Sequence, residues 1–296
     1  MQDLDRILVS LDRSDGAAVV LEKAVAMARA SNAALEVVHV IYEGIVDLPV
    51  CEVEKNQELK TFIMQTGETW LEDQLDCIRC KVKNIESVTL WNKDKWQGIL
   101  KAAAASGADL IIKGVEKDDE YSHLIRTPQD TNLIRHSEIP VMLVKDDAWV
   151  SNPVVLAAID VLNESQTELN KRILTEAKHL STVLGGELAI AVSYPMIEAW
   201  VEPSTVPLDL SRLRCEIEQT IRSKVSQLVS QLGICYRYLH VEEGKPAMRI
   251  RNLLEETGSE LLVIGTVGRT GVKSLVIGNT SETILQYTHC DVVVLR

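Results

Sequence analysis

The chain has 296 residues, which suggests about two domains, and its 46% hydrophobic and 25% charged residues are ordinary for a soluble globular protein. A formal net charge of −12 at pH 7 argues against a nucleic-acid surface and against docking on anionic lipid, because phosphate groups are bound largely through lysine and arginine. Aromatic residues make up 4% and include one phenylalanine, so we expect aliphatic cores.

The opening segment, MQDLDRILVSLD, carries Asp3 and Asp5 where a secretory signal would have basic residues. No apolar run reaches the roughly 18 residues that a membrane span needs. The six cysteines are too few for a disulfide scaffold in a chain of this length. We therefore expect a reduced, cytoplasmic protein without a membrane span.

The first half of the chain alternates short apolar runs with longer segments of helical spacing. The runs ILVSL, LEVVHVI, SVTLW, DLIIKG and PVMLV predict strands, and residues 14–30 and 54–83 predict helices. In the second half the runs are VVLAAI, ELAIAVS, CYRYLHV, ELLVIG and DVVVLR, and residues 210–232 have helical spacing. Near-continuous apolar runs fit strands buried in a parallel sheet, and their alternation with helices predicts βαβ units. Each half is expected to be a doubly wound α/β domain with a five-stranded parallel sheet.

The two halves also repeat each other in sequence. The matching segments, each without a gap, are 114–144 with 265–295, ADLIIKG (108–114) with SELLVIG (259–265), and RILVSLD (6–12) with VVLAAID (154–160). Segments that stay in step over such a length predict two copies of one domain. We place copy one at residues 1–148 and copy two at residues 149–296, joined near the polar segment KDDAWVSNP.

Copy two carries a glycine pattern that suits a phosphate group. GTVG at 265–268 follows the fourth strand, and GNTS at 278–281 comes after nine further residues. The carboxyl edge of a parallel sheet is where such folds bind ligands, and glycine lets successive backbone N–H groups surround an anion. A helix predicted over 280–288 would direct its positive N-terminus to the same place. The alternative is that the glycines only make turns, which the spacing of the two clusters disfavours.

Charged and polar side chains accompany these glycines. Arg269 and Lys273 lie in the intervening loop and would screen phosphate charge. Asn279 followed by Glu282 fits a cap pairing at the start of the last helix.

The pattern G-x2-G-x9-G followed by a small polar residue resembles the ATP-binding signature of the universal stress protein family. The first strand of copy two ending in Asp, the segment HVEEGKPAMRIRNLLEETGSELLVIG and the terminal CDVVVL strand resemble that family too. The tandem layout with a degenerate first copy is similar to the E-type tandem members. The resemblance covers the whole chain and is most specific over residues 240–296.

This resemblance implies a Rossmann-like, adenine nucleotide α-hydrolase-like fold with sheet order 3-2-1-4-5 in each copy. It implies a stress-response role and ATP, with or without magnesium, held between the ends of the first and fourth strands. The residues implied for the site are Asp160 and Val192 beside the adenine, Gly265, Gly268, Gly278 and Asn279 along the phosphates and ribose, and Thr280 and Ser281 as hydroxyl donors. The family signature has Ser or Thr where this chain has Asn279, whose side-chain amide can still donate.

Copy one lacks most of this motif. When the two copies are aligned, Gly114 matches Gly265, but Lys117, Thr127 and Pro128 stand at the positions of Gly268, Gly278 and Asn279. The segment 116–120 also places four carboxylates where a triphosphate would lie, and like charges repel. We therefore predict that only copy two binds ATP, and that copy one pairs with it or shapes another ligand site or partner surface.

Three weaker features leave alternatives open. Cys77-x2-Cys80 lies inside the helix predicted over 54–83; ordinary thiols are favoured there over zinc binding or redox sensing, because a structural zinc site usually needs four ligands. His39 fits a hydrogen-bonded core histidine, and His240 lies near the proposed pocket. The segment YPMIEAWVEPSTVP (194–207) is either a packed loop or part of an apolar groove.

A regulatory or binding protein is favoured over an enzyme. The chain has no Walker lysine motif, no GxSxG elbow and no evident catalytic set or metal-ligand spacing, so we expect at most slow ATP turnover. Two alternatives stay open: a nucleotide-free adaptor or binder of lipid or another apolar ligand, and a weak ATPase or nucleotidyl- or phosphoryl-transfer enzyme.

Each half ends in a short apolar strand, PVMLV and DVVVLR, and an edge strand needs a cover. We expect these two strands to pair in antiparallel fashion, so that one chain mimics a dimer of single-copy relatives. Protein partners and a further homodimer are left open.

Overall fold

The computed structural model describes residues 4–14, 16–47, 53–115, 128–145, 148–197, 209–266 and 279–296. The described residues form two compact units, one up to Ala148 and one from Trp149 onward, which we call the N-terminal and the C-terminal unit.

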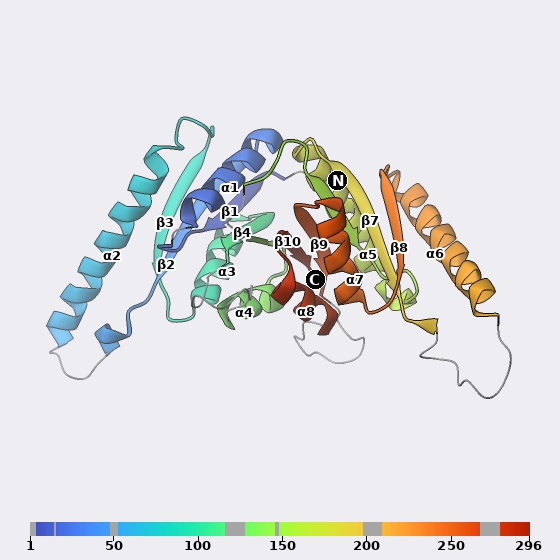
Figure 1. Cartoon of the computed structure of the whole chain (residues 1–296). Coiled ribbons are helices and arrows are strands. Elements are labelled where there is room, and N and C mark those ends of the chain that lie inside the picture. The colour runs from blue at the N-terminus through green and yellow to red at the C-terminus, as the bar shows by residue number, and fades with distance from the viewer. Residues whose placement is uncertain are drawn as a thin grey trace. The chain divides into compact units, whose positions relative to one another are not determined.

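The N-terminal unit alternates strands and helices along the chain (Figure 1). Its elements are β1 (Arg6–Ser10), α1 (Ala17–Ser31), β2 (Ala34–Ile41), the 3-10 helix η1 (Gly44–Asp47), α2 (Val53–Asp76), β3 (Ile85–Trp91), α3 (Lys95–Ser106), β4 (Leu110–Gly114), α4 (Pro128–His136) and β5 (Val141–Val144). The strands lie in the order β3-β2-β1-β4-β5, and each neighbouring pair is parallel.

The C-terminal unit repeats this plan. Its elements are β6 (Val154–Ala158), the 3-10 helix η2 (Glu164–Gln166), α5 (Thr167–Val183), β7 (Glu187–Tyr194), α6 (Leu210–Leu232), β8 (Tyr238–Glu243), α7 (Pro246–Thr257), β9 (Leu261–Gly265), α8 (Asn279–Tyr287) and β10 (Asp291–Leu295). Its parallel strands lie in the order β8-β7-β6-β9-β10. Both units therefore confirm the predicted Rossmann-like α/β fold with order 3-2-1-4-5. The expected pairing of β5 with β10 stays a prediction.

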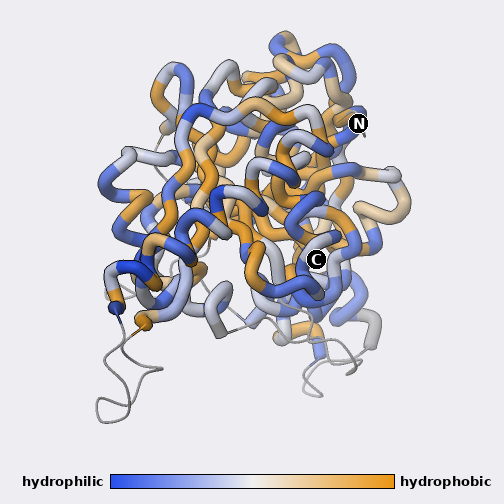
Figure 2. Tube along the Cα trace, turned by 90° about the vertical axis from the view of Figure 1, so that its right-hand side faces the viewer, coloured by the Kyte–Doolittle hydropathy of each residue, from blue (hydrophilic) through white to orange (hydrophobic). Residues whose placement is uncertain are grey.

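The central strands are almost wholly buried, as the continuous apolar runs predict. β1 and β9 each bury four of their five residues, whereas the edge strands β3 and β8 are only partly covered. Figure 2 shows the same distribution, with hydrophobic stretches inside and hydrophilic ones on the outer helices. None of the helices in the described part of the chain is long and apolar enough to cross a membrane.

The helix predicted over 54–83 is shorter in the structure. α2 ends at Asp76, and a series of turns follows, so the expectation that Cys77 and Cys80 lie inside a helix is wrong. The N–H groups of Ile78 and Lys81 donate to carbonyls three residues earlier, which tightens the chain into turns. The chain must reverse here to enter β3, and Ile78 is buried as it does so. By contrast, α6 has the predicted bounds.

Candidate functional site

A cavity of about 390 Å³ opens where β6, β7 and β9 end in the C-terminal unit. Side chains from α5, α7 and α8 complete its wall. Its wall includes Asp160, Ser193, Pro246, Ile264, Gly265, Thr280 and Ser281. The cavity thus lies at the carboxyl edge of a parallel sheet beside its first and fourth strands, where ligands bind in folds of this class. The structure places four of the predicted site residues, Asp160, Gly265, Thr280 and Ser281, in the wall of this cavity, and their contact with a nucleotide stays a prediction.

Asp160 is held in place by Asn170 of α5. The Asp160 N–H donates to Asn170 Oδ1 at 3.1 Å, and Asn170 Nδ2 donates to the Asp160 carbonyl at 2.6 Å. Asn170 is 3% exposed, so this paired contact is shielded from water. The Asp160 carboxylate also accepts from the N–H groups of Leu162 and Asn163. The exposed carboxylate is therefore fixed at the mouth of the cavity.

Gly265 is required by packing as well as by any ligand. A Cβ at this position would lie 2.5 Å from Leu169 Cδ2 of α5, closer than side-chain atoms can approach. A Cβ at the matching Gly114 of the N-terminal unit would lie 2.8 Å from Val20 Cγ2 of α1. Helix packing against the fourth strand therefore explains why this glycine is kept in the copy that has lost the others.

The start of α8 meets the end of β9 at the cavity. Ser281 is 4% exposed, and its hydroxyl donates to the Gly265 carbonyl at 2.8 Å. Ser281 thus serves first to join the strand to the helix, a contact that the sequence does not reveal. Thr280 is half-buried and lines the cavity, and Asn279 is the first residue of α8. The other predicted site residues, Gly268, Arg269 and Gly278, lie outside the described residues.

Two further candidates are not in the cavity wall. Val192 of β7 is 1% exposed, and the lining comes from its neighbours Ala191 and Ser193, because successive side chains of a strand point to opposite faces. The expected contact of Val192 with an adenine stays a prediction. His240 pairs with Ala191 in the sheet and is not among the lining residues either.

The end of β7 is anchored to its neighbours. Tyr194 is 2% exposed, and its hydroxyl donates to Glu218 of α6 at 3.3 Å. Burial raises the pKa of Tyr194 to about 12, and the charges of Glu218 and Glu243 act in the same direction. Glu243 accepts from the Ile197 N–H at 2.9 Å, which fixes the chain beyond β7. Residues 198–208, which hold the rest of the expected groove or loop, lie outside the described residues.

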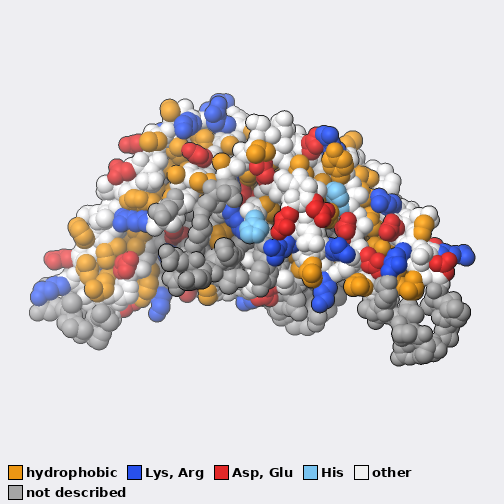
Figure 3. Space-filling model, in the orientation of Figure 1, with side chains coloured by type: hydrophobic (Ala, Val, Ile, Leu, Met, Phe, Trp, Pro, Cys, Tyr) orange, Lys and Arg blue, Asp and Glu red, His pale blue; other side chains and the backbone are white. Residues whose placement is uncertain are grey.

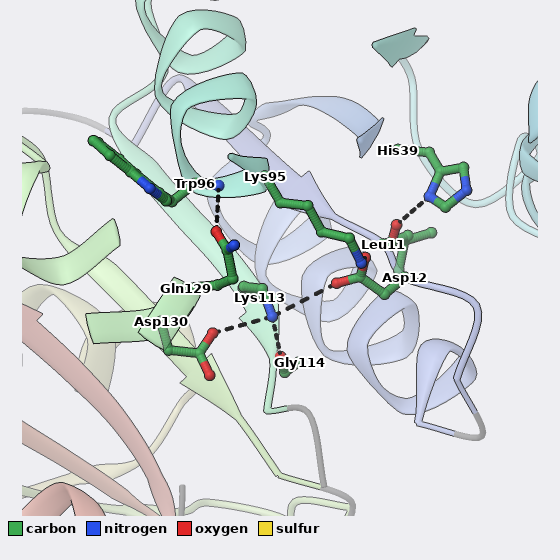
Figure 4. A network of polar contacts seen from close by, with 9 residues as sticks. All are labelled: Leu11, Asp12, His39, Lys95, Trp96, Lys113, Gly114, Gln129 and Asp130. Carbon is green, nitrogen blue, oxygen red and sulfur yellow. Dashed lines mark hydrogen bonds and ion pairs between the residues drawn. The ribbon is translucent and has the colours of Figure 1, made fainter. Parts of the chain in front are cut away.

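Four charged side chains of the N-terminal unit form a network at the carboxyl edge of its sheet (Figure 4). Lys113 Nζ lies 3.1 Å from Asp130 Oδ1 and 3.6 Å from Asp12 Oδ2, and it donates to the Gly114 carbonyl at 3.1 Å. Lys95 Nζ lies 3.0 Å from Asp12 Oδ1. Lys113 and Asp130 are at most 1% exposed, so each charge is offset by its partner rather than by water.

This network holds the positions that line the cavity in the other unit. By the repeat, the matching residues are Asp12 with Asp160, Lys95 with Pro246, Lys113 with Ile264, and Asp130 with Ser281. All four C-terminal counterparts line the 390 Å³ cavity. The two aspartates match each other, and the N-terminal unit adds two cations and a further carboxylate at positions that line the cavity in the C-terminal unit. Sequence reasoning missed Lys113 and Asp130, although a lysine within the apolar run LIIKG signals a buried charge.

A cavity of about 590 Å³ borders this network: Asp12 and Lys95 are in its wall, together with residues of β2 and α2. Its wall includes His39, which is 5% exposed and whose Nδ1 is 2.7 Å from the Leu11 carbonyl oxygen. Burial lowers the pKa of His39, against an opposing effect of the Leu11 hydrogen bond. The ring also packs on Trp70, with centroids 4.6 Å apart. His39 is thus the buried, hydrogen-bonded histidine that the sequence predicts.

Comparison with known proteins identifies the family. The profile described as "Universal stress protein family" matches residues 4–145 and again residues 154–296. The chain belongs to the universal stress protein family. It has two domains of this family in tandem, as the glycine motif and the internal repeat predict.

Two of the similar proteins are named universal stress protein E. Universal stress protein E of Photorhabdus laumondii is 24% identical over 306 residues, covering 100% of this chain and 96% of that protein. Universal stress protein E of Escherichia coli K12 is 26% identical over 251 residues, covering 82% and 78%. A solved structure of a functionally unknown protein from Pseudomonas aeruginosa PAO1 has a TM-score of 0.77 at 24% identity, covering 99% of this chain and 93% of that one. This last likeness supports the fold.

Proposed function

We propose that this universal stress protein is an ATP-binding regulatory protein whose C-terminal unit holds the nucleotide and whose N-terminal unit does not. The observation that carries the proposal is the contrast at three matching positions. Pro246, Ile264 and Ser281 line an open cavity beside Asp160, whereas their N-terminal counterparts are charged and form a network with Asp12. A ligand that fits the first place would have to break buried ion pairs in the second.

The residues around the C-terminal cavity fit a nucleotide. Its volume, about 390 Å³, is within the usual range for small-molecule sites, and its wall is mostly apolar with some polar side chains. The fixed Asp160 carboxylate would accept from ribose hydroxyls or from the base. The start of α8 would meet the phosphates, because the first N–H groups of a helix lack intrahelical partners and carry partial positive charge.

The proposed role is regulatory rather than catalytic. A bound nucleotide changes the balance between two conformations of a protein only if it binds one of them more tightly. In this chain the segment between β9 and α8 would contact the phosphates, so the proposed regulation would act through that segment. On the face that Figure 3 shows, the described acidic and basic side chains are interspersed. A mixed surface of this kind suits protein partners better than a polyanion such as nucleic acid.

Equilibrium dialysis of the full chain against labelled ATP tests this proposal. We expect saturation at one ATP per chain, and loss of binding in Gly268→Asp and Gly278→Asp, because a carboxylate there would repel phosphate. Thr127→Asp, the matching change in the N-terminal unit, is the control and leaves binding unchanged. Two ATP per chain, no ATP at millimolar concentration, or full binding by Gly278→Asp would each contradict the proposal.

A further inference from the structure

Two cysteines follow the end of α2, and both are exposed. The turn that carries them is well defined, because the Arg79 N–H donates to the Leu75 carbonyl at 2.9 Å and the Lys81 N–H donates to the Ile78 carbonyl at 2.8 Å. Ile78 lies between the two cysteines in the sequence and is 5% exposed, so it anchors the turn to the core. The thiol groups of Cys77 and Cys80 have no hydrogen-bond partner among the described residues.

The spacing of these cysteines is compatible with a disulfide bond. Residues three apart in a turn have Cα atoms within about 7 Å of each other, and disulfides join Cα atoms about 4.4–6.8 Å apart. Cys77 and Cys80 can therefore be joined by side-chain rotation and a small adjustment of an exposed turn. Cys215 and Cys235 are exposed as well, but they lie far from each other in the sequence and provide internal controls.

Charges of both signs adjoin the cysteine pair: Arg79, between the two cysteines, is paired with Glu72 and Asp76 of α2, and lysines follow the turn. A pocket of about 260 Å³ adjoins the turn, and its wall includes Arg29, Lys81 and Lys83. Lys83 donates to Asn32, whereas Arg29 and Lys81 have no ion-pair partner among the described residues. A cluster of cations of this kind attracts anionic reactants and raises the rate at which they arrive.

We propose that Cys77 and Cys80 form a redox pair that a small anionic disulfide, such as glutathione disulfide, oxidises to an intramolecular disulfide. The thiolate of one cysteine attacks the small disulfide, forms a mixed disulfide and releases one small thiolate. The second cysteine thiolate then attacks the protein sulfur of the mixed disulfide, forms the Cys77–Cys80 bond and releases the second small thiolate. The protein gives up two protons and two electrons, and one small disulfide is reduced to two thiols.

A metal site is a weaker explanation of the same pair. Structural zinc sites usually need four ligands, and the described residues contain no group of three or more His, Cys, Asp or Glu side chains placed to hold a metal. Dithiol–disulfide exchange needs only the two cysteines and an accessible approach, both of which the turn supplies.

The test treats the reduced full chain with glutathione disulfide, quenches it by alkylation and measures intact mass. In a background with the other four cysteines replaced, Cys51→Ser/Cys215→Ser/Cys235→Ser/Cys290→Ser, we expect the Cys77–Cys80 disulfide without retained glutathione. Adding Cys77→Ser or Cys80→Ser should instead leave one glutathione on the remaining cysteine of the pair. Retained glutathione with both cysteines present, or no reaction at either, would overturn the proposal.

The charge of the small disulfide is tested separately. Cystamine has the same reactive bond but carries positive charge, so it should oxidise the pair roughly tenfold more slowly than glutathione disulfide at low salt. Lys81→Glu should reduce this preference for glutathione disulfide over cystamine. Cys215 and Cys235, measured in a Cys77→Ser/Cys80→Ser background, should react with the two reagents at similar rates. Equal rates for the two reagents at the pair would contradict the part assigned to Arg29 and Lys81.

Discussion

Lys113 and Asp130 form an ion pair across 3.1 Å, with both side chains at most 1% exposed. They lie at the positions that Ile264 and Ser281 hold in the C-terminal unit, where there is a cavity instead. A buried ion pair seldom adds stability over an apolar pair of similar volume, but removing only one of its members is strongly destabilising because the other charge is left buried. The pair therefore places internal charge in one copy of the domain at positions that line a cavity in the other.

The first prediction concerns Lys113→Met, which leaves Asp130 and Asp12 without their shared cation. We expect the free energy of unfolding of the N-terminal unit to fall by about 3–5 kcal/mol. The double change Lys113→Ile/Asp130→Ser, which copies the C-terminal residues, should recover most of this loss because no buried charge of the pair remains. Urea unfolding of the full chain measures both. A double variant as unstable as Lys113→Met would show that the pair is not the cause.

The sequence predicts the fold of each unit but not the packing at two of its glycines. The repeat and the apolar runs predict both sheets and their order, because burial of continuous aliphatic strands leaves few other arrangements. The motif also predicts that Gly265 lies at the site. The sequence does not show that Leu169 and Val20 need the space at Gly265 and Gly114, because that contact joins a helix to a strand far away in the chain.

The site is predicted less completely than the fold for the same reason. Asp160 could be located from the end of its strand, but Asn170, which fixes it through two hydrogen bonds, has no motif of its own. The Lys113 network joins residues from separate parts of the chain, so the sequence pattern pointed to Asp12 at the end of its strand but not to the pairing of Lys113 with Asp130. Local signals reveal which residue types are present, and tertiary contacts decide what they do.

The second prediction is that Gly265→Ala destabilises the C-terminal unit by about 1–3 kcal/mol, because the new methyl group overlaps Leu169. Adding Leu169→Ala should make the same glycine change less costly, since the space is then free. A double-mutant cycle measured by thermal unfolding gives the coupling between the two positions. Additive effects, with no coupling, would contradict the packing explanation for this glycine.

The third prediction concerns Asn170→Ala. Removal of the amide leaves the Asp160 N–H and carbonyl without their buried partner, which should cost about 1–3 kcal/mol of stability. It should also weaken ATP binding, because Asp160 would no longer be held at the cavity. Calorimetry with ATP measures the second effect, and Ser181→Ala, which removes a buried hydroxyl of the same helix away from the cavity, is the matched control. Loss of stability with unchanged affinity would separate Asn170 from the proposed site.

The fourth prediction follows from the lowered pKa of His39, whose main cause is burial. The unfolded chain takes up a proton at this histidine near pH 6.5, whereas the folded chain does so only at lower pH. The unfolded state therefore binds more protons between these two values, and stability must fall as the pH is lowered through that interval. We expect urea unfolding to show a larger loss between about pH 7.5 and about pH 5.5 in the native sequence than in His39→Phe.

His39→Phe keeps an aromatic ring against Trp70 but cannot take up a proton, so it removes the pH dependence while preserving part of the packing. It also removes the Leu11 hydrogen bond, which lowers stability at every pH by a similar amount and leaves the slope as the informative quantity. The exposed His289 serves as the control, and His289→Gln should keep the slope of the native chain. Equal slopes for the native chain and His39→Phe, or an NMR titration of His39 at or above pH 6.5, would contradict a buried neutral imidazole.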